Sequence, residues 1–302
     1  MSNKKYLIVI VGATAVGKTE LSINLAKIFN TEIISCDSRQ FFRETNLGTA
    51  KPSSEELSLV KHHFINNLSI FDDYDVKTFE EEALGLLEEI FQKHDKTIMT
   101  GGSGLYVDAI CNGFDAIPSI DPAIRKEIIQ LYEKNGIEYL QKEVEEFDPH
   151  YYGHVDQKNP QRLMRALEVI RGTGQPYSSF RVKKKTKRPF GIIKIGLELD
   201  REFLYKRIDQ RMDMMIEAGL FEEAAGLYPF RDLNALQTVG YSEIFGFLEG
   251  QYDKEEAGRL LKRNSRRYAK RQMTWFRKDE EIKWFNPNQQ EMIHQYILDQ
   301  IG

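Results

Sequence analysis

The sequence predicts an α/β fold in which a parallel sheet forms the core, a helical domain is inserted into it, and the C-terminal region is mostly helical. Three observations support this prediction. Short apolar runs alternate with helix-periodic segments over the N-terminal third, a glycine-rich loop joins the first run to a helix, and from Ile117 onward helix signals dominate. Alternating strands and helices are typical of a parallel sheet with crossover helices.

The N-terminal third contains three predicted strands and two predicted helices. Its strands are short apolar runs rich in β-branched residues, as expected for strands buried on both faces. Its helices repeat apolar residues three and four positions apart. In chain order the elements are the strand Tyr6–Val11, the helix Thr19–Phe29, the strand Thr31–Cys36, the helix Phe79–Phe91 and the strand Lys96–Thr100.

The next segment carries helix signals instead. Asp121 and Asn159 each precede a proline, so a capping side chain stands before a residue suited to the first helical turn. Gly136 and Gly172 are the predicted helix ends.

The strand pattern returns at Phe190–Leu199, and a helix is predicted at Glu202–Ala218. We therefore expect residues 117–188 to form a helical insertion domain. The core would consist of residues 1–116 and 189–302, with its C-terminal part mostly helical.

The formal net charge of −4 conceals an uneven distribution. Residues 51–100 contain eleven acids and five lysines, whereas Arg259–Lys278 contain nine Lys or Arg and no acid. A polyanion responds to the local patch rather than to the total, so this C-terminal segment is a candidate phosphate-binding helix. Leu261, Tyr268 and Trp275 recur at seven-residue intervals and form its predicted core stripe, with base stacking as the alternative.

Two features bear on the compartment of the protein. Cys36 and Cys111 lie far apart with no CxxC or His-rich spacing, which disfavours a disulfide framework or a zinc site and favours the reducing cytoplasm. No apolar run approaches the ~18–20 residues of a membrane-spanning helix. Lys4 and Lys5 resemble the start of a signal peptide only superficially, because the short apolar run after them leads directly into a glycine loop.

The strongest motif is the pattern G-x-x-x-x-G-K-[ST] between the first predicted strand and helix. The amides of such a loop bind phosphate oxygens, Lys18 adds a positive charge, and the Thr19 hydroxyl can bind Mg²⁺, which we expect as the cofactor. The core is therefore predicted to be P-loop NTPase-like. The phosphate site would comprise Gly12, Ala13, Thr14, Ala15, Val16, Gly17, Lys18 and Thr19.

The P-loop does not identify its phosphate ligand. In many ATPases a neighbouring strand ends in an acidic residue that holds Mg²⁺. Here the strand Lys96–Thr100 ends in Gly101 and Gly102, and no N-K-x-D guanine-reading motif is present. Nucleotide hydrolysis is disfavoured, whereas a small-molecule kinase remains an alternative.

Asp37 follows the second predicted strand. Ligands of open α/β sheets bind at the carboxyl ends of the strands, so Asp37 is expected near the P-loop. A carboxylate there can accept a proton from an attacking hydroxyl or amine. A helix N-cap is the alternative role.

Seven blocks of residues occur in order across nearly the whole chain: Gly12–Thr19, Asp37–Gln40, Gly48–Pro52, Gly101–Tyr106, Asn159–Glu168, Val239–Tyr241 and Lys270–Arg277. Together they resemble the bacterial tRNA dimethylallyltransferase family. Each later block is only modestly specific alone, but seven in register are hard to obtain by chance.

The resemblance implies that a dimethylallyl group passes from dimethylallyl diphosphate to N6 of the adenosine on the 3′ side of the tRNA anticodon, with release of pyrophosphate. Because the N6 lone pair is delocalised into the ring, a base is useful, and Asp37 is the candidate. Lys18, Mg²⁺ at Thr19 and, by resemblance, Arg211 would stabilise the leaving group. Thr14 would lie near the reacting end of the donor.

Arg207 and Arg211 are four residues apart and so share one face of their predicted helix. A solvated helical face is the alternative interpretation. For the basic run Arg181–Arg188, RNA contact and a solvated loop are equally open.

The resemblance also implies contacts with the tRNA anticodon stem-loop. A stacked adenine cannot present N6 to a buried donor, so it must be extruded into the site while its neighbours are held by side chains. The assigned residues are Asp37, Ser38, Arg39, Gln40, Ser103, Arg125, Gln161, Arg162, Leu163, Met164 and Arg165.

Some positions depart from the family pattern. Phe42 stands where tyrosine is common, which leaves a phenolic contact in doubt, and Ser103 stands where threonine is common but keeps the hydroxyl. The zinc-finger extension of eukaryotic relatives is absent, which favours the bacterial type, and a monomer is adequate for a tRNA-sized substrate. Besides the kinase, a non-catalytic RNA-binding protein is the remaining alternative, although binding alone would not need Asp37.

Overall fold

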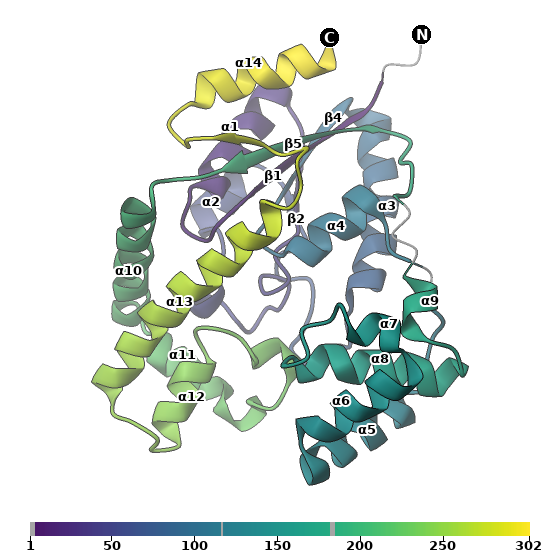
Figure 1. Cartoon of the computed structure of the whole chain (residues 1–302). Coiled ribbons are helices and arrows are strands. Elements are labelled where there is room, and N and C mark those ends of the chain that lie inside the picture. Colours follow the sequence, from purple (N-terminus) through teal and green to yellow (C-terminus); the bar gives the residue numbers. More distant parts are fainter. Residues whose placement is uncertain (1–3, 116, 182–184) are drawn as a thin grey trace. The chain divides into compact units, whose positions relative to one another are not determined.

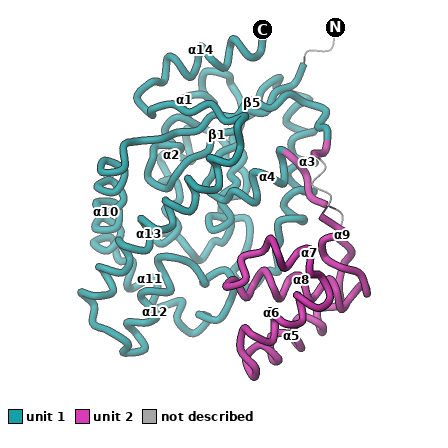
Figure 2. The backbone as a smooth tube through the Cα atoms, in the orientation of Figure 1, with its two compact units in different colours: residues 1–111, 187–302 teal, residues 112–186 magenta. Residues whose placement is uncertain are grey.

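The computed structural model describes residues 4–115, 117–181 and 185–302, and the chain divides into two compact units. Unit 1 comprises residues 1–111 and 187–302, and unit 2 comprises residues 112–186 (Figure 2). The sequence placed these divisions slightly further along the chain, after residues 116 and 188.

Unit 1 is built on a six-stranded parallel sheet with the strand order β3-β2-β4-β1-β5-β6 (Figure 1). Because β2, β4 and β1 are neighbours, their carboxyl ends meet at one edge of the sheet, where ligands of open α/β folds bind. The strands are β1 (Tyr6–Gly12), β2 (Ile33–Ser35), β3 (His62–His63), β4 (Lys96–Thr100), β5 (Gly191–Leu197) and β6 (Lys283–Phe285).

The central strand β1 is buried on both faces, as its continuous apolar sequence predicts. Its alternate residues enter two separate apolar clusters. Ile8 and Ile10 pack in the cluster that holds apolar residues of α1 and α14, whereas Leu7 and Val9 pack in the cluster formed with α3 and α4. The sheet therefore has helices on both faces.

The predicted strands and helices of the N-terminal third are confirmed, and most of their ends agree within about two residues. The second strand begins at Ile33 rather than at Thr31, and α3 is longer than predicted at both ends. The helices of unit 1 are α1 (Lys18–Phe29), α2 (Ser54–Leu59), α3 (Val76–Lys93), α4 (Gly104–Asn112, ending at the unit boundary), α10 (Arg201–Glu217), α11 (Leu220–Leu227), α12 (Ser242–Leu248), α13 (Lys254–Phe276) and α14 (Gln290–Ile301). Short 3₁₀ turns lie at Leu47–Thr49, Tyr228–Phe230 and Asn234–Leu236.

Two short strands were missed by the sequence patterns. β3 has two residues and β6 has three, which is too short for an alternating pattern to be recognised. β6 interrupts the C-terminal region that was expected to be mostly helical, and it pairs in parallel with β5.

Unit 2 is a helical domain with its own apolar core, in which Leu140, Val144, Leu163 and Leu167 are fully buried. The capping signals at Asp121 and Asn159 are confirmed, because both side chains accept amide hydrogen bonds at the starts of α5 and α8. The helices are α5 (Pro122–Asn135), α6 (Ile137–Phe147), α7 (Pro149–Tyr152), α8 (Pro160–Thr173) and α9 (Tyr177–Phe180).

One predicted helix end in unit 2 is right and one is wrong. Gly136 follows the last residue of α5 as predicted. Gly172 lies inside α8, which continues to Thr173 and is capped by Gly174 in the left-handed conformation with a φ of 71°. The helix ends two residues later because Gly174, not Gly172, adopts the backbone conformation of a C-terminal cap.

Within the described parts of both units, no helix combines the length and the apolar character needed to cross a membrane.

Candidate active site

The P-loop lies between β1 and α1, where its sequence pattern placed it. Gly17 caps α1 with a left-handed backbone, so the amides of the first helical turn face the loop. Among the described residues, no backbone carbonyl outside the helix accepts from the amides of Gly17, Lys18 or Thr19. Free amides at a helix N-terminus form a ready site for an anion.

The Lys18 ammonium group turns back onto its own loop. Its Nζ atom donates to the carbonyl oxygens of Gly12 at 3.0 Å and Ala13 at 2.8 Å. Burial is the main cause that lowers the pKa of Lys18 to about 8; the nearby Asp37 opposes this shift, and Arg211 adds to it. A bound anion would offer this ammonium group a stronger partner than two carbonyls.

Asp37 lies just beyond β2 in a turn rather than at a helix start. The helix N-cap alternative is therefore wrong, because residues 38–41 form turns, and Asp37 Oδ1 accepts the amide of Arg39 at 3.2 Å. Burial raises the pKa of Asp37, and this effect is opposed by the Arg39 amide and by the charge of Lys18. A carboxylate with a raised pKa is better suited to accept a proton than an exposed one.

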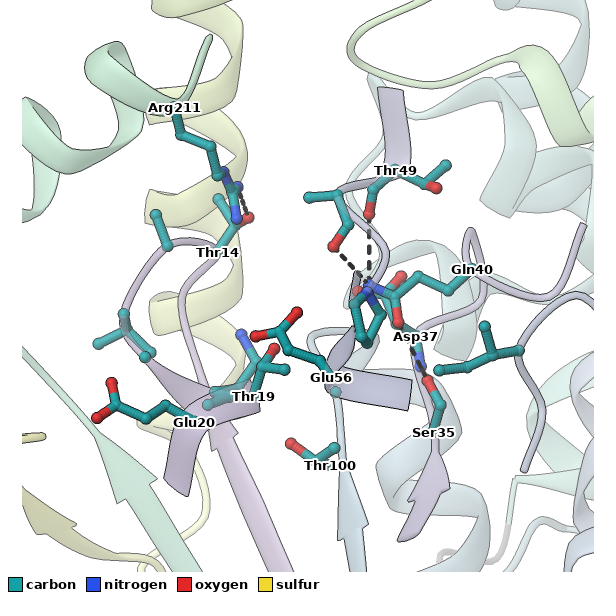
Figure 3. A pocket seen from close by; sticks show the side chains of 18 of the residues that line it. Thr14, Thr19, Glu20, Ser35, Asp37, Gln40, Thr49, Glu56, Thr100 and Arg211 are labelled. Atoms are coloured by element: carbon teal, nitrogen blue, oxygen red, sulfur yellow. Dashed lines mark hydrogen bonds between the residues drawn. The ribbon is translucent and has the colours of Figure 1, made fainter. Parts of the chain in front are cut away.

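A cavity of about 390 Å³, which we call the large cavity, is lined by the P-loop and by residues from the ends of β2 and β4 (Figure 3). A second cavity of about 60 Å³, the small cavity, adjoins it and is lined by Arg39, Tyr268 and neighbouring groups. The residues common to both linings are Thr14, Asp37, Thr49, Ala50 and Arg211. The proposed base, the P-loop threonine and the proposed arginine therefore stand at the boundary of two spaces.

Arg211 on α10 points toward the P-loop in Figure 3. Its guanidinium group donates to the Thr14 hydroxyl, and its Nε atom is buried without a hydrogen-bond partner in the described structure. Burial lowers the pKa of Arg211, with Asp37 acting in the opposite direction. A buried unpaired donor that lines a cavity is suited to an anionic ligand. Arg207 also lines the large cavity, but its side chain is exposed. The alternative of a solvated helical face is therefore wrong for Arg211 and still applies to Arg207.

The turn that holds Asp37 is tied to the end of β4. Ser38 donates its amide to Ser103 Oγ at 3.0 Å, and the two hydroxyl groups lie 3.1 Å apart. Arg39 reaches the carbonyls of Asn234 at 2.8 Å and of Ala235 at 3.3 Å. The structure thus brings the predicted residues of the Asp37 turn and Ser103 together.

Gln40 belongs to the same turn and bonds to other segments. Its Nε2 atom donates to the carbonyls of Ala50 at 3.1 Å and Thr49 at 3.4 Å, and its Oε1 atom accepts from Ser35 at 3.4 Å. These bonds connect β2 with the Gly48–Pro52 block.

Sequence reasoning missed the residue that braces this block. Glu223 on α11 accepts the amides of Leu47 at 2.9 Å and Gly48 at 3.1 Å, and it also accepts the Tyr241 hydroxyl at 2.6 Å. A Cβ atom on Gly48 would lie 2.5 Å from the ring of the buried Tyr241. Glycine at this position therefore permits the loop to rest on the aromatic ring. No local pattern marks Glu223, because its partners are distant in the sequence.

The basic side chains of α13 and of the two residues after it fall into two groups, those with an ion pair and those without one. Arg259, Lys262, Arg266 and Arg277 form ion pairs with glutamate or aspartate at 2.5–3.2 Å. Within the described residues 259–278, the exposed Lys and Arg side chains without a recorded ion pair are Arg267, Lys270, Arg271 and Lys278. These four, which we call the free basic stripe, recur at helical spacing and are the groups available to phosphates.

The predicted core stripe of α13 holds only in part. Leu261 is fully buried, and Tyr268 is half-buried at the small cavity. Trp275 is 37% exposed, and its Nε1 atom donates to Asp108 at 3.0 Å, so its assignment to the core is wrong. A seven-residue interval drifts around a straight helix, which moves the third residue away from the core.

In unit 2, Arg125 and Arg165 converge on the buried Glu168 at 3.0 and 2.6 Å, and Arg125 also donates to Gln161 at 2.9 Å. Arg162 is exposed. Arg125, Gln161, Arg165 and Glu168 thus form one polar cluster.

Two residues of the same block point elsewhere. Leu163 is fully buried and Met164 is 3% exposed in the core of unit 2, so the expectation that their side chains contact tRNA is wrong. The cause is the helical period, since positions 163 and 164 face the core while 161, 162 and 165 face outward.

Of the basic run, residues 182–184 lie outside the described residues. Arg181 stacks against the rings of Tyr151 and Tyr177. Arg188 is buried and forms an ion pair with Glu80 at 2.5 Å, so neither a solvated loop nor RNA contact describes it.

Two further side chains raised by the sequence are buried. Phe42 packs in an apolar cluster with Tyr241 and offers no hydroxyl to a ligand. The thiol of Cys36 is buried, which raises its pKa and makes it a poor nucleophile.

The residues around the P-loop fit a hydrated magnesium ion. Thr19 lines the large cavity together with the carboxylates of Asp37 and Glu56, and oxygen is the ligand that Mg²⁺ prefers. Among the described residues, no three acidic, histidine or cysteine side chains form a cluster that would hold a metal by themselves. Mg²⁺ is commonly held by few protein ligands together with substrate phosphates and water, so the Thr19 hydroxyl suits such an ion.

The sequence is similar to that of known proteins along nearly its whole length. Positions 40–279 match the family model for IPP transferase. A tRNA dimethylallyltransferase from Cytophaga hutchinsonii is 53% identical over 293 residues, which cover 97% of this chain and 96% of the relative.

Solved structures give the same result. A tRNA isopentenylpyrophosphate transferase from Bacillus halodurans has a TM-score of 0.73 and 38% identity, with coverage of 99% of this chain and 97% of the other. A eukaryotic dimethylallyltransferase acting on tRNA has a TM-score of 0.75 and 27% identity, with coverage of 90% of this chain and 70% of the other.

Proposed function

This chain belongs to the IPP transferase family, and we propose that it transfers the dimethylallyl group of dimethylallyl diphosphate to N6 of the tRNA adenosine that follows the anticodon. The observation that carries the proposal is the position of Asp37, Thr14 and Arg211 at the boundary of two cavities. The large cavity would take the diphosphate donor and the small cavity would admit the acceptor amine. Transfer requires the two substrates to meet at one point.

The donor diphosphate would be held by the P-loop. The free amides of Gly17, Lys18 and Thr19 would donate to its phosphate oxygens, and the Lys18 ammonium would exchange its two carbonyl partners for phosphate oxygens. Mg²⁺, bound at Thr19 and the diphosphate, would supply charge neutralisation for the leaving group.

Arg211 would stabilise the charge that develops on the oxygen between the isoprenoid carbon and phosphorus. Its guanidinium group is anchored on Thr14, and its Nε donor has no other recorded partner in the described structure. Donors fixed in a buried site stabilise developing charge without reorganisation, which is where most electrostatic catalysis arises.

Asp37 would act as the general base. As the new C–N bond forms, the C–O bond of the donor breaks, pyrophosphate leaves with that electron pair, and the N6 proton passes to the Asp37 carboxylate. Burial of Asp37 raises its pKa and strengthens it as a proton acceptor.

Recognition of tRNA would use surfaces of both units. In unit 1, the turn residues Ser38, Arg39 and Gln40, together with Ser103, would hold the extruded adenine and its neighbours. The free basic stripe of α13 would contact phosphates.

In unit 2, Arg125, Gln161, Arg162 and Arg165 would contribute further contacts to the anticodon stem-loop. Glu168 fixes two of these arginines before RNA arrives, which lowers the entropic cost of ordering them. We also propose that the protein works as a monomer in the cytoplasm, which size-exclusion chromatography with and without tRNA would test.

A labelling assay tests the proposal. Purified protein with Mg²⁺, labelled dimethylallyl diphosphate and an unmodified anticodon stem-loop is expected to label the RNA without ATP. The matched control is the same stem-loop with guanosine in place of the target adenosine, which should stay unlabelled. Label transfer from γ-labelled ATP to a small acceptor would establish a kinase instead, and RNA binding without transfer would favour a non-catalytic protein.

A further inference from the structure

Gln272 differs from its neighbours on α13. It follows the exposed Lys270 and Arg271 of the free basic stripe, yet its own side chain is only 5% exposed. It belongs to the block Lys270–Arg277, which carried family resemblance without any chemical role for the glutamine. A buried amide must satisfy both its acceptor and its donors.

The Gln272 amide bridges two loops. Its Oε1 atom accepts the backbone N–H of Thr14 at 2.8 Å, and its Nε2 atom donates to the carbonyl oxygen of Gly102 at 3.0 Å. The first loop is the P-loop, and the second follows β4 beside the Asp37 turn. Only a side chain with an acceptor at one atom and a donor at the other can join an N–H to a C=O in this way.

Gly102 has no side chain because the glutamine occupies that space. A Cβ atom there would lie 2.1 Å from Gln272 Nε2 and 3.7 Å from Asp37 Oδ2. The bridge therefore ends next to the carboxylate of the proposed base.

The bridge also fixes the direction of the Thr14 peptide. Because the Thr14 amide is engaged by Gln272, it is not one of the donors available to the diphosphate. The Thr14 side chain instead receives the Arg211 guanidinium group, at the boundary of the large and small cavities. The Gln272 side-chain amide thus fixes the position of Thr14 relative to the loop beside Asp37.

We propose that Gln272 is a positioning residue for the transfer reaction, which sets the place of Thr14 and Arg211 relative to Asp37. The expected effect on kcat rests on the proposed function. It assigns to the inward face of α13 a role distinct from the phosphate contacts of its outward face. Misplacement of reacting groups by about 1 Å can lower a rate by about 100-fold, so such a bridge has a measurable effect.

The test uses two variants of Gln272 and one control. Gln272→Met keeps the length and removes both hydrogen bonds, and kcat is expected to fall about 10- to 100-fold while the KM for tRNA stays within about twofold. Leu261→Ala disturbs the buried side of the same helix far from either loop, so it should lower the melting temperature and leave kcat unchanged below it.

Gln272→Glu adds a pH signature. An ionised glutamate accepts from Thr14 but cannot donate to Gly102, whereas a protonated one can do both. The ratio of its kcat to that of the wild type should therefore rise as pH falls, when it is measured over the pH range in which Asp37 is ionised in both proteins. A merely structural loss in both Gln272 variants would give a ratio independent of pH.

Hydrogen exchange at the Thr14 amide supplies a readout besides activity. We expect this amide to be protected in the wild type and to exchange faster in Gln272→Met. If the wild type labels no RNA, the proposed function fails, and the exchange measurement still decides whether Gln272 positions Thr14. Equal exchange in both proteins would overturn the inference, as would wild-type turnover in Gln272→Met, a loss of tRNA affinity alone, or an equal loss of kcat in Leu261→Ala.

Discussion

Replacement of Asp37 by asparagine isolates the function of its carboxylate. Asparagine has the same shape and keeps an oxygen that can accept the Arg39 amide, so the turn is expected to survive. What is lost is the ability to take the N6 proton. General-base catalysis typically contributes about 10²- to 10⁴-fold, so kcat should fall by that factor, equivalent to about 3–5 kcal/mol in the activation barrier.

The pH dependence of kcat/KM for the donor tests in which protonation state Asp37 acts. Burial raises the pKa of Asp37 above its ordinary value, so the wild-type rate should rise with pH through that raised pKa, as the carboxylate ionises. It should fall again above about 8, because the pKa of Lys18 is lowered to about 8 and the neutral amine binds the diphosphate less well. Asp37→Asn should lose the acidic limb and keep the alkaline one.

Stability should change in the opposite direction to activity. In the folded state the raised pKa means that ionised Asp37 destabilises the protein at pH values above it, and asparagine removes that charge. The melting temperature of Asp37→Asn should therefore equal or exceed that of the wild type at neutral pH. Turnover above about a tenth of the wild-type rate, or an unchanged acidic limb, would refute the assignment of Asp37 as the base.

Three further outcomes are expected. Lys18→Met should weaken pyrophosphate binding by about 10- to 100-fold in calorimetry, since a charge-assisted hydrogen bond is lost, and undiminished affinity would contradict its role. Arg267→Ala should reduce the slope of log affinity for tRNA against log salt by about 0.7–0.9, while Lys262→Ala, already ion-paired at 2.6 Å, should leave it unchanged; equal slopes would remove the distinction between paired and free charges. Gly48→Ala should lower the free energy of unfolding by about 1–3 kcal/mol in chemical denaturation, because its Cβ would overlap the ring of Tyr241, and wild-type stability would show that the loop can move away.

The sequence was informative wherever function follows from local order. A strand, a glycine loop and a helix in succession place Lys18 at a helix N-terminus. The rule that parallel strands end at one edge of the sheet places Asp37 beside that loop. Both depend on short-range pattern and general topology alone, which explains why they could be predicted.

The sequence was uninformative wherever the partner is distant. Glu223 accepts the amide of Leu47 across a sequence separation of 176 residues. No local repeat of apolar or polar residues encodes such a contact. Charge counting had the same weakness, because it treated Lys262 and Arg266 as available to RNA. Their aspartate partners lie on α10, at sequence separations of 49 and 57.

The three charges at the boundary of the cavities depend on one another. Burial disfavours the ionised form of Asp37, Lys18 and Arg211 alike. The Asp37 carboxylate supports the charge of both cations and they support its own, whereas Arg211 disfavours the charge of Lys18. A diphosphate donor would compensate the two cations, so the carboxylate would lose part of their support, and its pKa would rise further. We therefore expect Asp37 to become a stronger base once the donor is bound, which favours proton removal from N6 only when a carbon electrophile is present to receive the amine. On this account the three buried charges also link the base strength of Asp37 to donor binding, which no single motif in the sequence expresses.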